Sequence, residues 1–189
     1  MTALIKITPD STPLHLRDAL RLQCMDIHMQ VEEAVTAGAY FASLEGYRRW
    51  LGIMRQVHAE FAHACDIGSE ALGLEPVSGA LLQALKVDLG GGLCPVGKAR
   101  THKSAAIGVA YVFEGSAMGA RLLQRRIADL EGAPTAYLDL LVTLSRLRWP
   151  ATQGALAMYP GPQEAVVAGA LEVFERLHQL FTDGRPGNA

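Results

Sequence analysis

An imidazole and a guanidinium share one side of a predicted helix near the N-terminus. His28 follows Arg21 by seven residues, and at ~100° per residue this spacing places both side chains on nearly one line, beside Cys24. A neutral imidazole binds transition metals, and a guanidinium binds carboxylates. The two side chains therefore face the same way, but the pair alone does not indicate a function. Taken alone, His28 also fits a hydrogen-bonded structural histidine at the edge of an apolar stripe.

A further unusual feature is a glycine-rich face in the segment around residue 115. Gly108, Gly115 and Gly119 fall within ~40° of one another on a helical wheel, together with Val112 and Leu122. Each glycine inside a helix costs roughly 0.5–1 kcal/mol relative to alanine. Three on one face predict a close approach by a neighbour, which is either another helix or a flat ligand.

The elements that must position these residues are helices. Clusters of Pro and Gly divide the sequence into stretches with helical periodicity and no alternating strand pattern. The predicted helices cover roughly residues 14–36, 43–68, 77–88, 100–131, 134–148 and 163–182. We therefore expect an all-α, single-domain helical bundle over residues 1–189, with residues 1–12 and 183–189 as flexible ends.

Composition excludes several classes of protein. The formal net charge of -2, from 17 Lys+Arg against 19 Asp+Glu, argues against a nucleic-acid partner. The three cysteines form no CxxC pair, which is typical of a reducing compartment. The N-terminus has no export signal, and no apolar run approaches ~18 residues, so we expect a cytoplasmic protein with no membrane contact.

Two motifs resemble the haem oxygenase family. They are Arg21-x6-His28-x-x-x-Glu32 and Tyr111-Val-Phe-Glu-Gly115-Ser-Ala-Met-Gly119-Ala, and the latter is most similar to the oxygenases that accompany bacterial phytochromes. The resemblance implies that His28 is the axial ligand of haem and that Arg21 pairs with a propionate. It also implies that the distal helix kinks over the other face of haem at Gly115 and Gly119. The fold expected from it is the helical bundle of that family.

The implied reaction takes haem and dioxygen to biliverdin, ferrous iron and carbon monoxide. The chain has no flavin or nicotinamide motif, so the electrons would come from an external donor such as a reductase or ferredoxin. Ser116 stands where the family carries an acidic residue, and we expect it to hold a relay water, with Glu114 as a candidate substitute acid. Ala110 replaces a tyrosine that contacts propionates, and Arg121 is a further candidate for binding the anion.

Three other interpretations remain open. A haem- or bilin-binding protein without turnover is consistent with the missing distal acid. A di-iron oxidase would use Glu60-x-x-His63 and Glu175-x-x-His178, but helical wheels turn His63 and Glu175 away from their apolar stripes. The dipeptide Cys94-Pro95 resembles a haem-regulatory motif, although a simple connection fits it better.

Overall fold

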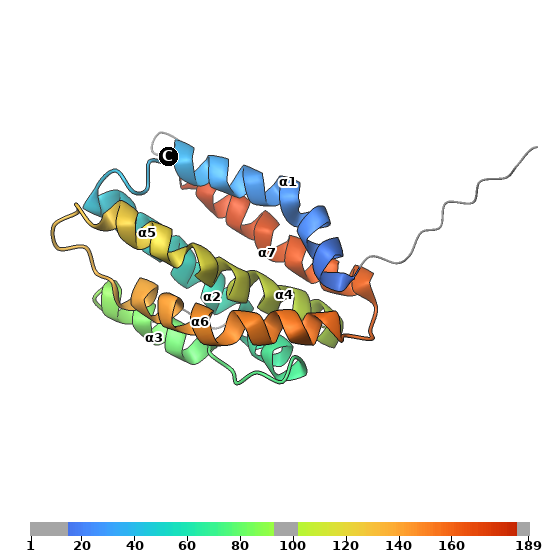
Figure 1. Ribbon diagram of the computed structural model, residues 1–189. Coiled ribbons are helices and arrows are strands. Elements are labelled where there is room, and N and C mark those ends of the chain that lie inside the picture. Colours follow the sequence, from blue (N-terminus) through green and yellow to red (C-terminus); the bar gives the residue numbers. More distant parts are fainter. Residues whose placement is uncertain (1–14, 93–101, 185–189) are drawn as a thin grey trace, which may run out of the picture.

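The computed structural model describes residues 15–92 and 102–184, and within these ranges the chain is all-helical. Together the helices form one bundle (Figure 1). The elements are α1 (Leu16–Ala37), α2 (Leu44–Ala71), α3 (Ser78–Asp88), α4 (Lys103–Ser116), a short 3-10 helix η1 (Ala117–Gly119), α5 (Ala120–Ile127), α6 (Ala136–Ala157) and α7 (Gln163–Asp183).

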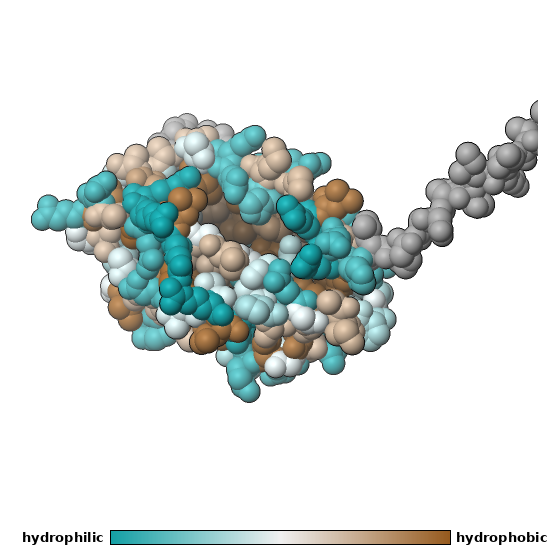
Figure 2. Space-filling view, viewed as in Figure 1, coloured by the Kyte–Doolittle hydropathy of each residue, from teal (hydrophilic) through white to brown (hydrophobic). Residues whose placement is uncertain are grey.

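Helix α4 occupies the centre of the bundle. It packs on α7 and on α2, while α3 and α6 pack against each other on the lower side in Figure 1. Helix α1 lies along α7 and touches α6, but makes little contact with α4 and α5. A hollow lies between α1 on one side and the α4–α5 segment on the other (Figure 2).

Glycines allow the backbones of the central helices to touch. A Cβ added at Gly108 of α4 would collide with the Val166 carbonyl of α7, and one added at Gly169 of α7 would collide with the Ala105 carbonyl of α4. Gly68 of α2 meets α4 in the same way at Ala106. Backbones this close require residues without side chains on the facing surfaces.

The apolar periodicity predicted four of the helices within a few residues of their observed ends. Helices α1, α2, α3 and α7 correspond to the predicted ranges 14–36, 43–68, 77–88 and 163–182. Helix α2, for example, buries one apolar face with Trp50, Met54, Val57, Phe61 and Ala64. The expectation of an all-α bundle is confirmed.

The predicted single helix over 100–131 is interrupted. Helix α4 ends at Ser116, one 3-10 turn follows over Ala117–Gly119, and α5 continues only to Ile127. Among residues other than proline, glycine has the least preference for a regular helix, and Gly115 and Gly119 lie at this turn. Apolar periodicity does not reveal such a break, because the helical repeat of apolar residues is present both before and after the 3-10 turn.

The predicted helix end before Pro150 is also wrong, since α6 continues through this proline to Ala157. Proline inside a helix removes one hydrogen bond and costs ~3 kcal/mol. The C-terminal half of α6 buries Thr152 and Leu156, and the hydroxyl of Thr152 donates to the Arg148 carbonyl at 3.0 Å. Packing of this half on the bundle outweighs the effect of the proline.

His58 is a core histidine on the buried face of α2. Its Nε2 lies 2.7 Å from the hydroxyl of Tyr137, and its ring stacks on Phe113 at 4.6 Å between centroids. Burial lowers the pKa of His58 to about 3. The ring is therefore neutral, and its hydrogen bond with the Tyr137 hydroxyl fixes the start of α6 against α2.

Part of what was expected falls outside the described residues. The flexible end expected at 1–12, most of the one expected at 183–189, and the Cys94-Pro95 dipeptide are among the residues that the structure leaves undescribed. Asp183 is the last residue of α7, and Gly184 caps it. Over the described ranges, every helix is too short or too polar to cross a membrane.

Acid should destabilise the protein through His58. The unfolded chain binds a proton at this residue below about pH 6.5, whereas the folded chain does not, so stability is lost as the pH falls from there toward 3. We expect urea unfolding to show a loss of about 1 kcal/mol per pH unit below pH 6.

Two variants isolate this effect. His58→Phe should show a shallower dependence on pH, although its stability at pH 7 is lower because the Tyr137 hydroxyl loses its hydrogen-bond partner. Tyr137→Phe retains the histidine and should keep the acid dependence. An equally steep dependence in His58→Phe would contradict the assignment.

Candidate functional site

The opening beside α1 contains a pocket of about 330 Å³. Three helices line it: α1 supplies Arg21, Cys24, Met25 and His28, α4 supplies Tyr111, and α7 supplies Phe174. Figure 2 shows a hollow in this part of the surface, with hydrophobic residues in its depth. This volume lies at the lower end of the range for small-molecule sites, ~300–1,000 Å³, and the hollow extends it toward solvent.

His28 presents its imidazole to the pocket. The side chain is 53% exposed, so it is not a core histidine like His58. Phe174 of α7 packs edge-on against the ring, with 5.5 Å between centroids. Nδ1 lies 3.7 Å from Oε1 of Glu32, one turn further along α1. A small rotation would bring Nδ1 within hydrogen-bond range of this carboxylate and leave Nε2 for a ligand.

Arg21 brings positive charge to the same pocket. It is exposed and forms no ion pair with any residue in the described ranges, whereas Arg17 one turn earlier lies 3.6 Å from Asp18. Tyr111 lies close enough for the charges of Arg21 and Arg17 to oppose the rise in its pKa, which burial mainly causes. The pocket therefore offers an unpaired guanidinium and a phenol to an anionic group.

Cys24 is the other potential metal ligand in the pocket. The thiol is buried, and burial raises its pKa to about 11. Because a thiolate is the form of cysteine that binds metals, Cys24 is a poor ligand at neutral pH. The imidazole of His28 is the better nitrogen or sulfur donor of the two.

The three glycines predicted on one face differ in what surrounds them: Gly108 is packed against another helix, whereas Gly115 and Gly119 have room for a side chain. Gly108 serves the crossing of α4 and α7, and the protein itself fills the space beside it. Beside Gly115 a Cβ would make ordinary contact with the Trp149 ring at 3.6 Å, and beside Gly119 it would meet nothing within 4 Å. The fold therefore requires glycine at 108 but leaves space for a side chain at 115 and 119.

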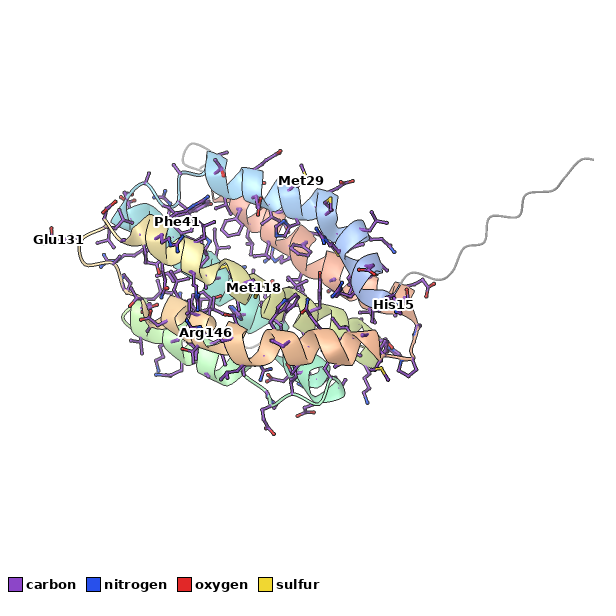
Figure 3. The ribbon with its side chains drawn as sticks, in the orientation of Figure 1. His15, Met29, Phe41, Met118, Glu131 and Arg146 are labelled. Carbon is purple, nitrogen blue, oxygen red and sulfur yellow. The ribbon has the colours of Figure 1, made fainter. Side chains whose placement is uncertain are left out.

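The remaining predicted site residues lie on the helix break or next to it. Ser116 is exposed, and its hydroxyl donates to the Phe113 carbonyl at 2.8 Å, so only its lone pairs remain for a water. Arg121 is exposed on α5 and is not among the residues that line the pocket. In Figure 3, Met118 marks this break and Met29 marks α1 on the other side of the hollow.

Glu114 is not available as a substitute acid. Its carboxylate is buried against α6, where Oε1 accepts hydrogen bonds from Arg148 at 2.6 and 2.9 Å. The same arginine donates to the backbone carbonyl of Glu75. This pair turns Glu114 away from the pocket and into the interface between α4 and α6.

Tyr111 is a pocket residue that was not predicted from the sequence. The family resemblance pointed instead to Ala110, which is fully buried beside Gly68 of α2 and does not reach the pocket. Tyr111 is four residues before Gly115, so the two share one face of α4. This i, i+4 spacing was the signal that could have identified it.

The described residues contain no di-iron site. Within 15–92 and 102–184, no three His, Cys, Asp or Glu side chains gather to hold a metal ion. Glu60 is paired with Arg176 at 2.7 Å, and His63 and Glu175 are exposed, as the helical wheels predicted.

Comparisons with known proteins leave the site to be interpreted on its own geometry. Neither the models of known protein families nor the curated proteins gave a match to this chain. The chemistry of the pocket therefore has to be inferred from its residues.

Alanine substitutions should separate the two kinds of glycine. Gly119→Ala should leave the stability unchanged or raise it by up to ~1 kcal/mol, because the side chain meets open space and alanine favours helix. Gly108→Ala should lower the stability by several kcal/mol or prevent folding, since the Cβ collides with α7. Thermal and urea unfolding measure both. Equal effects at the two positions would contradict the distinction.

Proposed function

We propose that this protein binds haem in the cleft between α1 and the α4–α5 segment and cleaves it oxidatively to biliverdin, ferrous iron and carbon monoxide. One observation carries the proposal. A half-exposed imidazole, His28, lies in an open pocket, and the neighbouring helix has two glycines, Gly115 and Gly119, that the fold does not need. Glycine at such positions is explained by a ligand that requires close approach to the backbone.

The residues of the pocket fit the chemistry of haem. The macrocycle is flat and apolar, and it matches the Met25, Phe174 and Tyr111 side chains. Its two carboxylates match the unpaired guanidinium of Arg21. Its iron matches the Nε2 of His28, while Glu32 can fix the tautomer through Nδ1. When bound, haem supplies the iron that reacts with dioxygen, and external electrons are required.

The other residues limit how the protein can deliver a proton. Ser116 can hold a water only as an acceptor, because its own hydroxyl donates to Phe113. Glu114 is committed to Arg148, so solvent water at the exposed break is the proton source that remains. This arrangement predicts slower turnover than a distal carboxylate would give.

The same observation keeps another candidate function open. A haem- or bilin-binding protein without turnover needs the cleft but no proton relay, and only haem would use the His28 imidazole as an iron ligand. Ascorbate and air distinguish the two functions in the hemin-loaded protein. Loss of the Soret band with gain of red-absorbing biliverdin, and carbon monoxide release, are expected of the oxygenase, while a binder keeps its Soret band.

His28→Ala should remove the axial ligand. We expect hemin to bind at least about tenfold more weakly and with an altered Soret band, since a metal–imidazole bond contributes more than ~1.4 kcal/mol. Absorption titration with hemin measures both quantities. His63→Ala is the matched control, because His63 is exposed on α2 and lies outside the pocket. Unchanged hemin binding in His28→Ala would refute the ligand assignment.

Gly119→Leu should bind hemin yet fail to degrade it. The side chain would enter the open space beside Gly119, where dioxygen must be accommodated. The comparable variant Gly79→Leu places the same side chain in open space on α3 and should retain full turnover. Turnover is followed as biliverdin formed per hemin. Normal turnover in Gly119→Leu would exclude this glycine from the reaction.

Arg21→Ala should weaken hemin binding by about two- to fivefold, because an exposed ion pair contributes up to ~1 kcal/mol. The effect should shrink as salt is added. Lys86→Ala removes the same charge from an exposed position on α3 and should change nothing. Equal affinities of Arg21→Ala and wild type at low salt would remove Arg21 from the site.

A further inference from the structure

Trp149 of α6 covers one of the two glycines in the distal segment. Its Cη2 and Cζ3 atoms lie 3.6 Å from the position that a Cβ of Gly115 would take. The indole also lies beside Tyr111, with 5.9 Å between ring centroids and 40° between ring planes. Since Tyr111 lines the pocket, Trp149 is the next ring beyond it, toward Gly115.

The backbone around Trp149 is held firmly. The preceding residue, Arg148, is bound through two hydrogen bonds to Glu114 of α4 and a third to the Glu75 carbonyl. The following residue is Pro150, whose ring fixes the backbone φ angle at that position. Thr152, in the next turn of α6, is fully buried. The indole is therefore presented to Gly115 from a fixed position on α6.

Trp149 differs from the other tryptophan of the chain. Trp50 is 5% exposed and packs among the rings of Phe41, Tyr47 and Tyr137, as a core residue does. Trp149 is only half-buried, and its contact with Gly115 is loose enough for a methyl group. Packing of the core does not explain a large flat ring beside a glycine that the fold does not require.

We propose that Trp149 determines the seating of the haem in the cleft. Its benzo edge closes the α6 end of the space beside Gly115 and limits how far the macrocycle can extend along α4. It thereby selects which edge of the macrocycle lies beside Gly119, and so which meso carbon is oxidised. This inference rests on the proposed function and identifies a specificity-determining residue of the same site.

Two variants test the role of the ring. Trp149→Phe removes Cη2 and Cζ3, the atoms nearest Gly115, and keeps an aromatic ring on α6. Trp149→Ala opens the whole space. Leu147→Ala is the control, because Leu147 is 72% exposed two residues away on the same helix. Circular dichroism and thermal unfolding establish that each variant is folded, and Trp149→Phe provides the test if Trp149→Ala does not fold.

One measurement does not depend on turnover. Proton NMR of the ferric, cyanide-bound haem protein shows the hyperfine-shifted haem methyl resonances, which report the orientation of the macrocycle relative to the axial imidazole. We expect Trp149→Ala to change the ratio of seated orientations by about two- to tenfold, the range given by an ordinary aromatic contact. Trp149→Phe should change it in the same direction, and Leu147→Ala should match wild type.

The other measurement is the ratio of biliverdin isomers, separated by chromatography after turnover with ascorbate. It should change in parallel with the methyl resonances. Wild-type resonances and isomer ratios in both Trp149 variants would overturn the inference, as would an equal change in Leu147→Ala. If wild type binds hemin but does not degrade it, the haem methyl resonances alone test the role of Trp149. If wild type binds no hemin, the proposed function and this inference fail together.

Discussion

The structure depends on the direct contact of helix backbones at α4. Gly108 and Gly169 bring α4 against α7, and Gly68 brings α2 against α4, so carbonyl groups of one helix face the Cα atoms of another. Helices held this closely cannot shift along each other without collision. Two sides of α4 are thus occupied by α2 and α7, and the side that carries Tyr111 is available to a ligand. The position of the cleft follows from these contacts, because α1 rests on α7 rather than on α4.

Gly108 and Gly119 look alike in the sequence, but the structure surrounds them differently. At Gly108 the missing side chain is replaced by protein, so its helix-breaking tendency is offset by backbone packing. At Gly119 no protein atom replaces it, and the local loss of helix stability has no structural compensation in the described residues. A site that lowers stability without improving packing is the expected sign of function. The helix break at residues 117–119 is the visible result of this local weakness.

Features that depend on local sequence patterns were predicted, whereas features that depend on contacts between helices were not. The ends of α1, α2, α3 and α7 followed from apolar periodicity and breakers, because these helices bury one continuous stripe. The shared side of His28 and Arg21 followed from their spacing at the edge of one such stripe, and both residues line one pocket. The course of α6 through Pro150 did not follow, since it depends on burial of Thr152 and Leu156 against other helices. The roles of Glu114 and Ala110 were also missed, because each faces a neighbouring helix that a wheel does not contain.

The ion pair of Glu114 and Arg148 fixes α4 against α6 next to Gly115 and Trp149. It is almost fully buried, so removal of either partner would leave an uncompensated charge. Because Glu114 immediately precedes Gly115 and Arg148 immediately precedes Trp149, this ion pair sets how closely the indole approaches Gly115. The same contact holds the carboxylate of Glu114 in the interface between α4 and α6. A ligand at this end of α4 would therefore meet a rigid indole and a glycine rather than a free carboxylate.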